Sequence, residues 1–142
     1  MSSEENKSIV RRFFELYDSG QIDVLEQEVM DPNVVVHLSG MPGPLNRAAF
    51  KQTGLVFHVA FPDHHSTIED QIAEGDQVVT RSTFQGTHRN ELQGIPPTGK
   101  QVTFTQLNIH RLANGKIVEA RAMFDQFGLM QQLGVIPVPG QA

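Results

Sequence analysis

The hydrophobic pattern of the chain changes near residue 65, and this change restricts the folds that the sequence can adopt. Before that point apolar residues recur at helical spacing, whereas after it they alternate with a period of two, which is typical of half-buried strands. Four segments follow the second pattern: residues 66–73, 77–85, 101–112 and 116–124. Tight turns at residues 74–76 and 114–115 join them in pairs, so the second half of the chain predicts an antiparallel meander.

The first half of the chain reads as helices around a single strand. Ser2 and Glu5 form a capping box that begins a helix ending at Gly20. Further elements are expected at residues 22–30 (helix), 33–38 (strand), 46–57 (a helix broken near Gly54) and 125–133 (helix). This order predicts an α+β fold in which a curved, mostly antiparallel sheet wraps around three to four helices.

Length and charge limit the number of domains and the classes of partner. The 142 residues predict a single domain, residues 1–142, in which residues 134–142 form an extended Pro/Gly tail. The net charge is −5 and no basic cluster occurs, so we expect no nucleic-acid partner. No apolar run is long enough to span a bilayer and the acidic, polar start is unlike a signal peptide, so we expect a cytoplasmic protein with no membrane partner.

The sequence does not predict a metal site. It contains no cysteine, which excludes thiolate ligands. Asp63-His64-His65 is the densest run of other ligand types, but adjacent side chains on extended backbone point to opposite sides and do not chelate together. We therefore expect no metal.

The turn at Asn114-Gly115 indicates which side chains of the last hairpin share a face. Counting outward from a two-residue turn pairs His110 with Glu119 and Asn108 with Arg121. Directly opposed residues share a face, so one face carries a polar set: Gln106, Asn108, His110, Glu119, Arg121 and Asp125. Two interpretations stay open, a solvated face or a concave face that lines a cavity. A bulge in the hairpin would destroy this pairing.

The polar face carries groups that exchange protons and bind anions. Burial raises the pKa of a carboxylate, so a partly buried Asp125 could exchange a proton near neutral pH. His110 could share that work or polarise a carbonyl, and Arg121 could orient an anionic oxygen. Each group also has a purely structural interpretation. Arg121 and Asp125 could form an ordinary salt bridge, and His110 could be a hydrogen-bonded histidine of the sheet.

The chain resembles the SnoaL-like polyketide cyclases of the NTF2-like superfamily, through motifs that follow one another along nearly its whole length. The matching pieces are residues 34–37, 61–63 (Phe-Pro-Asp), 74–76 (Glu-Gly-Asp), Arg81, 86–88 (Gly-Thr-His), 94–100 (Gly-Ile-Pro-Pro-Thr-Gly-Lys), 115–119, Asp125 and 128–134. The resemblance implies a cone-shaped α+β fold. It also implies a cofactor-free enzyme that closes a ring in a small hydrophobic or polyketide-like ligand by intramolecular aldol condensation. In the family an aspartate just before the final helix is the general acid/base, and Asp125 holds that position here.

The hairpin and the resemblance together yield the expected site residues. Asp125 and His110 are the expected catalytic residues. The expected substrate-binding residues are His37, Arg81, Asn108, Glu119, Arg121 and Met123. The expected apolar lining consists of Phe13, Phe14, Phe50, Phe57, Phe61 and Met123. Where the family usually has His-Trp-Asp, this chain has Ala120-Arg121-Ala122, and His110 occupies a position that is aromatic in the family; both changes predict a more polar pocket.

Two other functions compete with the cyclase. NTF2-like domains also serve as non-catalytic ligand-binding or association modules, and the altered residues 120–122 favour such a module. Alternatively, Glu119, Arg121 and Asp125 could position a water molecule for addition to an epoxide.

The second face of the hairpin indicates self-association. On the same pairing it carries apolar side chains, among them Leu107, Ile109, Val118, Ala120 and Phe124. An apolar sheet face that no helix covers needs a partner, and a second copy of the chain is the commonest one. We therefore expect a homodimer joined through the sheets.

Overall fold

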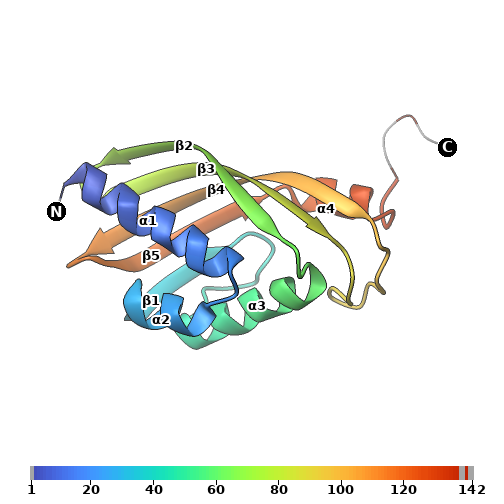
Figure 1. Ribbon diagram of the computed structural model, residues 1–142, viewed down its shortest axis with the longest axis horizontal. Helices are drawn as coiled ribbons and strands as arrows, with labels where there is room; N and C mark the ends of the chain where they lie inside the picture. Colours follow the sequence, from blue (N-terminus) through green and yellow to red (C-terminus); the bar gives the residue numbers. More distant parts are fainter. Residues whose placement is uncertain (1, 138–139, 141–142) are drawn as a thin grey trace.

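The computed structural model describes residues 2–137 and 140, and over these residues it contains four helices and one five-stranded sheet (Figure 1). The helices are α1 (Ser3–Asp18), α2 (Ile22–Glu28), α3 (Arg47–Ala60) and α4 (Gln126–Gln132). The strands are β1 (Met30–Leu38), β2 (His65–Glu74), β3 (Gln77–Thr87), β4 (Gln101–Ala113) and β5 (Lys116–Phe124). The predicted α+β class is confirmed, and the tail predicted at residues 134–142 lies partly outside the described residues.

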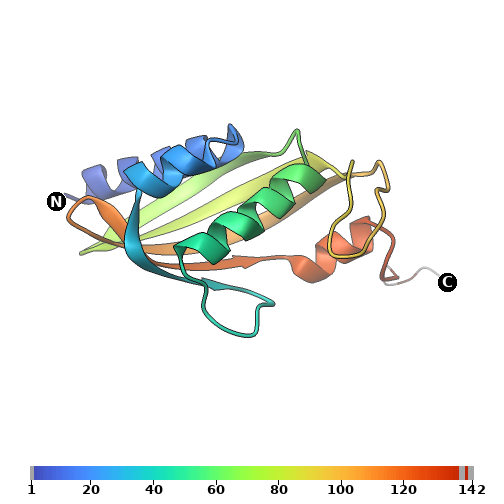
Figure 2. The ribbon, with the colours of Figure 1, turned by 90° about the horizontal axis from the view of Figure 1, so that it is seen from below.

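The strands lie in the order β1-β5-β4-β3-β2, so the first strand of the chain pairs with the last. The β2–β3, β3–β4 and β4–β5 pairs are antiparallel, and the β1–β5 pair is parallel. Helices α1, α2 and α3 lie on one side of the sheet, and α4 follows directly from the end of β5 (Figures 1 and 2). None of the helices in the described part of the chain has the length and apolar character needed to cross a bilayer.

Local signals explain most of the helix boundaries, with two corrections. The helix predicted to reach residue 30 ends at Glu28, because Met30 already belongs to β1. The capping box is confirmed, because Ser2 Oγ accepts the Glu5 N–H at 3.1 Å and Glu5 Oε1 accepts the Ser2 N–H at 3.3 Å. The predicted break near Gly54 is wrong, since α3 runs through it to Ala60. A Cβ at Gly54 would lie 3.2 Å from Tyr17 Cε2, so the glycine allows α1 and α3 to approach closely.

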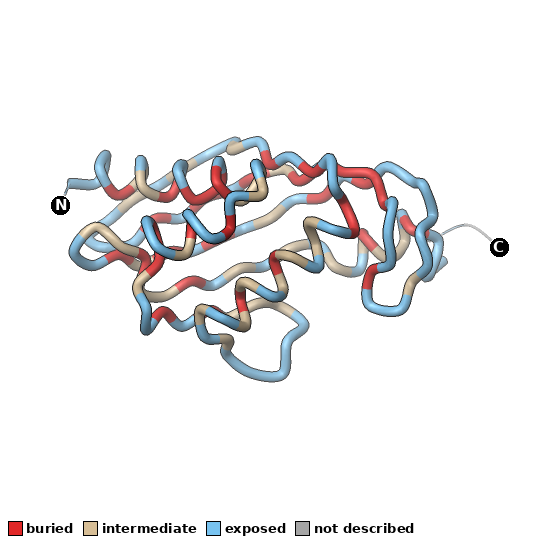
Figure 3. Tube along the Cα trace, turned by 60° about the horizontal axis from the view of Figure 1, so that its bottom comes forward, coloured by how far each residue is buried: buried red, intermediate tan, exposed pale blue. Residues whose placement is uncertain are grey.

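Burial follows the two faces of the sheet, with buried and exposed residues alternating along β3 and β4 (Figure 3). One buried cluster joins α1, α2 and β1 to the sheet, with Leu16, Leu25 and Val34 at most 1% exposed. A second cluster contains Phe61 and Phe84 and holds α4 through Leu129 and Leu133. The helices therefore cover the concave face of the sheet, as the fold requires.

The last hairpin contains a β-bulge at Val118. The two-residue turn is confirmed, with Ala113 opposite Lys116 and Leu112 opposite Ile117, and both Asn114 and Gly115 have positive φ. The next pair is Arg111 with Glu119, which leaves Val118 as an extra residue in β5.

Beyond the bulge, every pair of this hairpin differs from the prediction by one residue. His110 lies opposite Ala120 and Asn108 opposite Ala122, whereas the sequence predicted Glu119 and Arg121 in those places. The predicted pairing is therefore wrong from residue 111 onward. Because strand side chains alternate, the shift moves the second half of β5 to the other face of the sheet.

Candidate functional site

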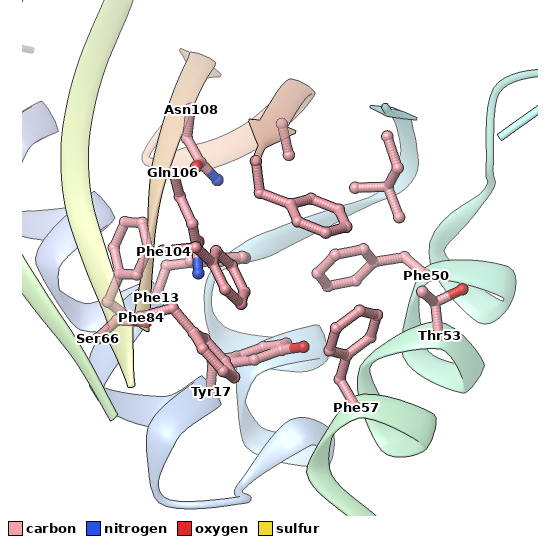
Figure 4. A pocket seen from close by; sticks show the side chains of 14 residues that line it. Phe13, Tyr17, Phe50, Thr53, Phe57, Ser66, Phe84, Phe104, Gln106 and Asn108 are labelled. Atoms are coloured by element: carbon pink, nitrogen blue, oxygen red, sulfur yellow. The ribbon is translucent and has the colours of Figure 1, made fainter. Parts of the chain in front are cut away.

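A cavity of ≈ 100 Å³ lies between helices α1 and α3 and the concave face of the sheet (Figure 4). It is lined by Phe13, Phe14, Tyr17, Leu38, Phe50, Thr53, Phe57, Ser66, Phe84, Phe104, Gln106, Asn108, Ala122 and Phe124. Four of the six residues that the sequence predicted as apolar lining are present: Phe13, Phe14, Phe50 and Phe57. Phe61 instead belongs to the second buried cluster, and Met123 is 65% exposed.

Aromatic rings make up most of the cavity wall. Phe13 and Phe50, from α1 and α3, have ring centroids 6.0 Å apart. Phe57 meets Phe124 edge to face at 6.0 Å, and Phe104 lies 5.4 Å from Phe124. Rings in these offset and edge-to-face arrangements stabilise one another and expose apolar carbon to the cavity. The wall therefore suits a flat, largely apolar ligand.

The polar groups in the wall are neutral. Gln106 and Asn108 extend from β4 into the cavity, and Tyr17 and Thr53 come from the two helices (Figure 4). Burial, assisted by the nearby Asp18 carboxylate, raises the pKa of Tyr17, so its phenol is protonated at neutral pH. Among the lining residues that the structure describes there is no Asp, Glu, His, Lys or Arg. The site can donate and accept hydrogen bonds, but it places no charge in the wall.

The bulge at Val118 separates several expected site residues from the cavity. Glu119, Arg121 and Met123 lie on the outer face of the sheet, and their expected position beside Asn108 and His110 is wrong. His37 lies opposite Arg121 in the β1–β5 pair and shares that outer face. Of the polar set predicted for one face, the structure keeps Gln106, Asn108 and His110 together on the concave side.

On the outer face, Glu119 is the centre of a group of charged side chains. Its carboxylate lies 3.7 Å from His37 Nε2, 3.6 Å from Arg111 Nε and 3.7 Å from Arg121 Nη2. Arg81 forms a separate exposed pair with Asp70, with Nη2 at 2.7 Å from Oδ2. Exposed pairs of this kind contribute little stability. The structure thus gives Arg121 a Glu119 partner where the sequence suggested Asp125.

Asp125 lies at the N-cap of α4, directly after Phe124. Its Oδ1 accepts the Gly128 N–H at 2.8 Å, and the residue is exposed. A Cβ at Gly128 would lie 2.1 Å from Asp125 Oδ2, so only glycine there leaves room for the carboxylate. Asp125 is not among the residues that line the cavity, although the ring of its neighbour Phe124 is.

His110 lies deeper than the cavity wall. It is 1% exposed, and its ring contacts Phe13 and Phe14 of α1, with centroids 5.0 and 6.4 Å away. Burial lowers the pKa of His110 to about 4, so the imidazole is neutral at pH 7. The expected general-acid/base role would require a proton that this environment disfavours.

The sequence did not predict a histidine cluster behind the cavity. His64 Nε2 lies 3.1 Å from His58 Nδ1, and His64 Nδ1 lies 3.5 Å from Asp18 Oδ1. The His64 ring stacks on Phe84 and lies 5.3 Å from Tyr17, both of which line the cavity. The cluster joins the ends of α1 and α3 to His64, which lies just before β2. No local motif signals it, because Asp18 is far from the two histidines in the sequence.

The SnoaL-like polyketide cyclase family matches residues 7–133. Aklanonic acid methyl ester cyclase DnrD from Streptomyces peucetius is 30% identical over 130 residues, which cover 89% of this chain and 88% of that protein. The corresponding cyclase AcmA from Streptomyces galilaeus is 30% identical over 139 residues, covering 92% and 91% of the two chains.

Solved structures share the fold. IdmH from Streptomyces antibioticus has a TM-score of 0.82 at 32% identity, covering 92% of this chain and 99% of IdmH. AclR from Streptomyces galilaeus has a TM-score of 0.87 at 24% identity, covering 96% of this chain and 100% of AclR. The NTF2-like fold that the sequence motifs suggested is thus confirmed.

The lowered pKa of His110 predicts how stability depends on pH. The unfolded chain binds a proton at this histidine near pH 6.5, whereas the folded chain binds it only near pH 4. Stability therefore falls as pH drops through this window, because the unfolded state takes up about one proton more. Urea unfolding at pH 7 and pH 5 should show a smaller loss for His110→Leu than for the wild type. Equal losses in the two proteins would contradict the assignment.

Proposed function

Because this chain belongs to the SnoaL-like polyketide cyclase family, we propose that it is an enzyme that closes a ring in a polyketide-like substrate by an intramolecular aldol-type reaction. The observation that carries this proposal is the cavity, in which an aromatic wall surrounds neutral hydrogen-bonding groups on β4. The related DnrD and AcmA are named as cyclases of aklanonic acid methyl ester, which makes that ester the first substrate to test.

The cavity wall suits the charge that develops in such a reaction. Removal of a proton from the carbon between two carbonyls produces an enolate, and its oxygen needs hydrogen-bond donors. The amides of Asn108 and Gln106 and the phenol of Tyr17 are donors in this wall. Fixed donors in an apolar site stabilise a developing oxyanion more than water does, because they need no reorganisation.

We propose that the proton itself is exchanged by Asp125. Its Oδ1 is held by the Gly128 N–H, and Phe124 connects the residue to the cavity wall. A substrate that extends past Phe124 would meet the carboxylate, which would take the proton from carbon and return it to the new alkoxide. Methylene protons between carbonyls are acidic enough for a carboxylate to act as the base.

A specific observation favours a second candidate, a non-catalytic ligand-binding module. Ala122 lines the cavity opposite Asn108, at a position where the resemblance places an acidic residue in the family. A chain that lacks this acidic residue beside the base would still bind the ligand. The epoxide alternative has less support, because Glu119 and Arg121 lie on the outer face, away from the cavity.

We also propose that the protein is a homodimer joined through the outer sheet face. Between the ion pairs of Glu119 and of Arg81, this face exposes large apolar side chains: Val79, Leu107, Ile109 and Met123, between 37% and 65% exposed. The described helices α1–α3 cover the opposite face, so these side chains need another partner. Ala120 and Phe124, expected on this face from the sequence, lie on the concave side because of the bulge.

Asp125→Asn tests the proposed proton transfer. Asparagine is as good an N-cap as aspartate, so α4 should remain in place. We expect turnover of aklanonic acid methyl ester to fall by about 10²–10⁴-fold, the usual contribution of a positioned acid/base, while the ester still binds. Asp76→Asn, in the exposed β2–β3 turn, is the matched control and should leave turnover unchanged. Full activity of Asp125→Asn would show that another group moves the proton.

Ala122→Asp separates the enzyme from the binding module. It places a carboxylate in the apolar wall, where burial raises its pKa toward neutrality. If the chain is a module that became inactive through loss of the acidic residue at position 122, this substitution should create turnover in a protein that has none. If Asp125 is the base of a working enzyme, the substitution should instead reduce turnover by crowding the cavity. Steady-state rates of the wild type and the variant, with the same substrate, distinguish the two.

Sedimentation velocity tests the dimer. At micromolar concentration the wild type should sediment as a species with twice the 15.8 kDa mass of one chain. Leu107→Lys combined with Ile109→Lys should yield a monomer, because two charges in the contact face cannot be buried without partners. Val56→Lys, on the exposed side of α3, is the control and should stay dimeric. A monomeric wild type would exclude the proposed assembly.

A further inference from the structure

Buried polar side chains continue beneath α1, beyond the part of the sheet that lines the cavity. On β4, Asn108 belongs to the cavity wall, and His110 follows two residues later on the same face. On β3, Thr80 lies opposite Asn108, and Ser82 follows two residues along the strand, opposite Gln106. Asn108, His110 and Ser82 are 6%, 1% and 0% exposed. They form one polar strip, partly open to the cavity and partly covered by α1.

The strip contains hydrogen-bonding atoms that are buried without partners. Among the residues that the structure describes, no group pairs with Asn108 Oδ1, Ser82 Oγ, or either ring nitrogen of His110. Buried polar atoms are nearly always paired, and leaving them unpaired destabilises a fold. An apolar side chain at position 110 would avoid that loss. The presence of an imidazole at this position is explained if a bound molecule supplies a hydrogen-bond partner for its ring nitrogens.

Two aromatic rings of α1, those of Phe13 and Phe14, lie between His110 and the cavity. Phe13 lines the cavity, and its ring centroid lies 5.0 Å from that of His110. The same ring contacts Phe50 at 6.0 Å across the cavity. Phe13 has the nearer ring, so a rotation of its side chain is the shortest way to extend the cavity along β4 toward His110.

We propose that His110 and the neighbouring Asn108 form a second, polar subsite that binds a carbonyl or hydroxyl oxygen of the ligand once the Phe13 side chain has turned away. The inference rests on the proposed function only in that the cavity holds an oxygen-bearing ligand. A neutral imidazole offers one donor and one acceptor, which suits either oxygen group. His110 thereby becomes a specificity-determining residue that distinguishes oxygenated ligands from hydrocarbons.

Two small probes of matched shape test the subsite. Acetophenone carries a carbonyl where ethylbenzene carries a methylene group, and either one fits a narrow aromatic cavity. In the ¹⁵N-histidine-labelled protein, acetophenone should shift the ring resonances of His110 and ethylbenzene should not. His110→Leu should weaken acetophenone binding about threefold to tenfold, the value of one hydrogen bond, and leave ethylbenzene binding within about twofold. Equal weakening of both probes would overturn the proposal.

A substitution at Phe13 tests whether its ring blocks the ligand from reaching His110. Phe13→Ala should open the path to His110 and tighten acetophenone binding relative to ethylbenzene. If the His110 resonances do not respond to acetophenone even in this variant, the subsite does not exist. Because both probes report on binding alone, these outcomes are independent of whether the protein turns over a polyketide.

Stability provides a second readout, with a matched control in the same protein. His110→Leu should raise the urea midpoint, because it removes two unpaired buried nitrogens. His88 is equally buried, at 0% exposure, but its Nδ1 lies 3.0 Å from Thr98 Oγ1 and accepts the Thr98 N–H at 3.2 Å. His88 Nε2 is buried without a partner among the described residues, but the paired Nδ1 is lost with the ring, so His88→Leu should lower the midpoint. A lower midpoint for His110→Leu as well would show that its imidazole is paired in the free protein, and would overturn the proposal.

Discussion

A single extra residue in β5 decides which chemistry each face of the sheet carries. Because side chains alternate along a strand, Val118 moves every later residue of β5 to the other face. Ala122 and Phe124 thereby join Asn108 in the cavity wall, while Glu119 and Arg121 face outward. Without the bulge, a carboxylate and a guanidinium would lie beneath the apolar faces of α1 and α3. The apolar cavity and the charged outer face both depend on this irregularity.

The sequence was sufficient for features that depend on local chemistry. The capping box, the two-residue turn and the alternation of β3 and β4 are all confirmed, because each is encoded within a few neighbouring residues. The bulge has no such signal: Val118 is β-branched like its neighbour Ile117, and no glycine marks the position. The predicted helix break at Gly54 was wrong because this glycine has a tertiary role: it leaves room for Tyr17 of another helix.

The candidate site follows the same division. The fold that the family resemblance implied was enough to predict four of the phenylalanines in the wall, and the strand pattern placed Asn108 and His110 on one face. The cross-strand partners were lost with the register, and the Asp18–His64–His58 cluster depends on tertiary contacts between three elements. What remains in the cavity is a set of neutral dipoles in an apolar wall, where hydrogen bonds are stronger than in water. Such a wall stabilises charge on a ligand without supplying a counter-charge.

The parallel pairing of β1 with β5 also determines when this wall can form. Leu38 ends β1, and its partner Ala122 comes from the last strand of the chain, so this part of the wall joins residues more than half the sequence apart. Contacts between such distant segments form late and slow the folding of a domain. During synthesis, β1 has no strand to pair with until the C-terminal hairpin has left the ribosome. Until then the backbone edge of β1 that will pair with β5 has no hydrogen-bond partner. Val34 and Val36, which are buried in the folded protein, lie on this exposed strand of the nascent chain.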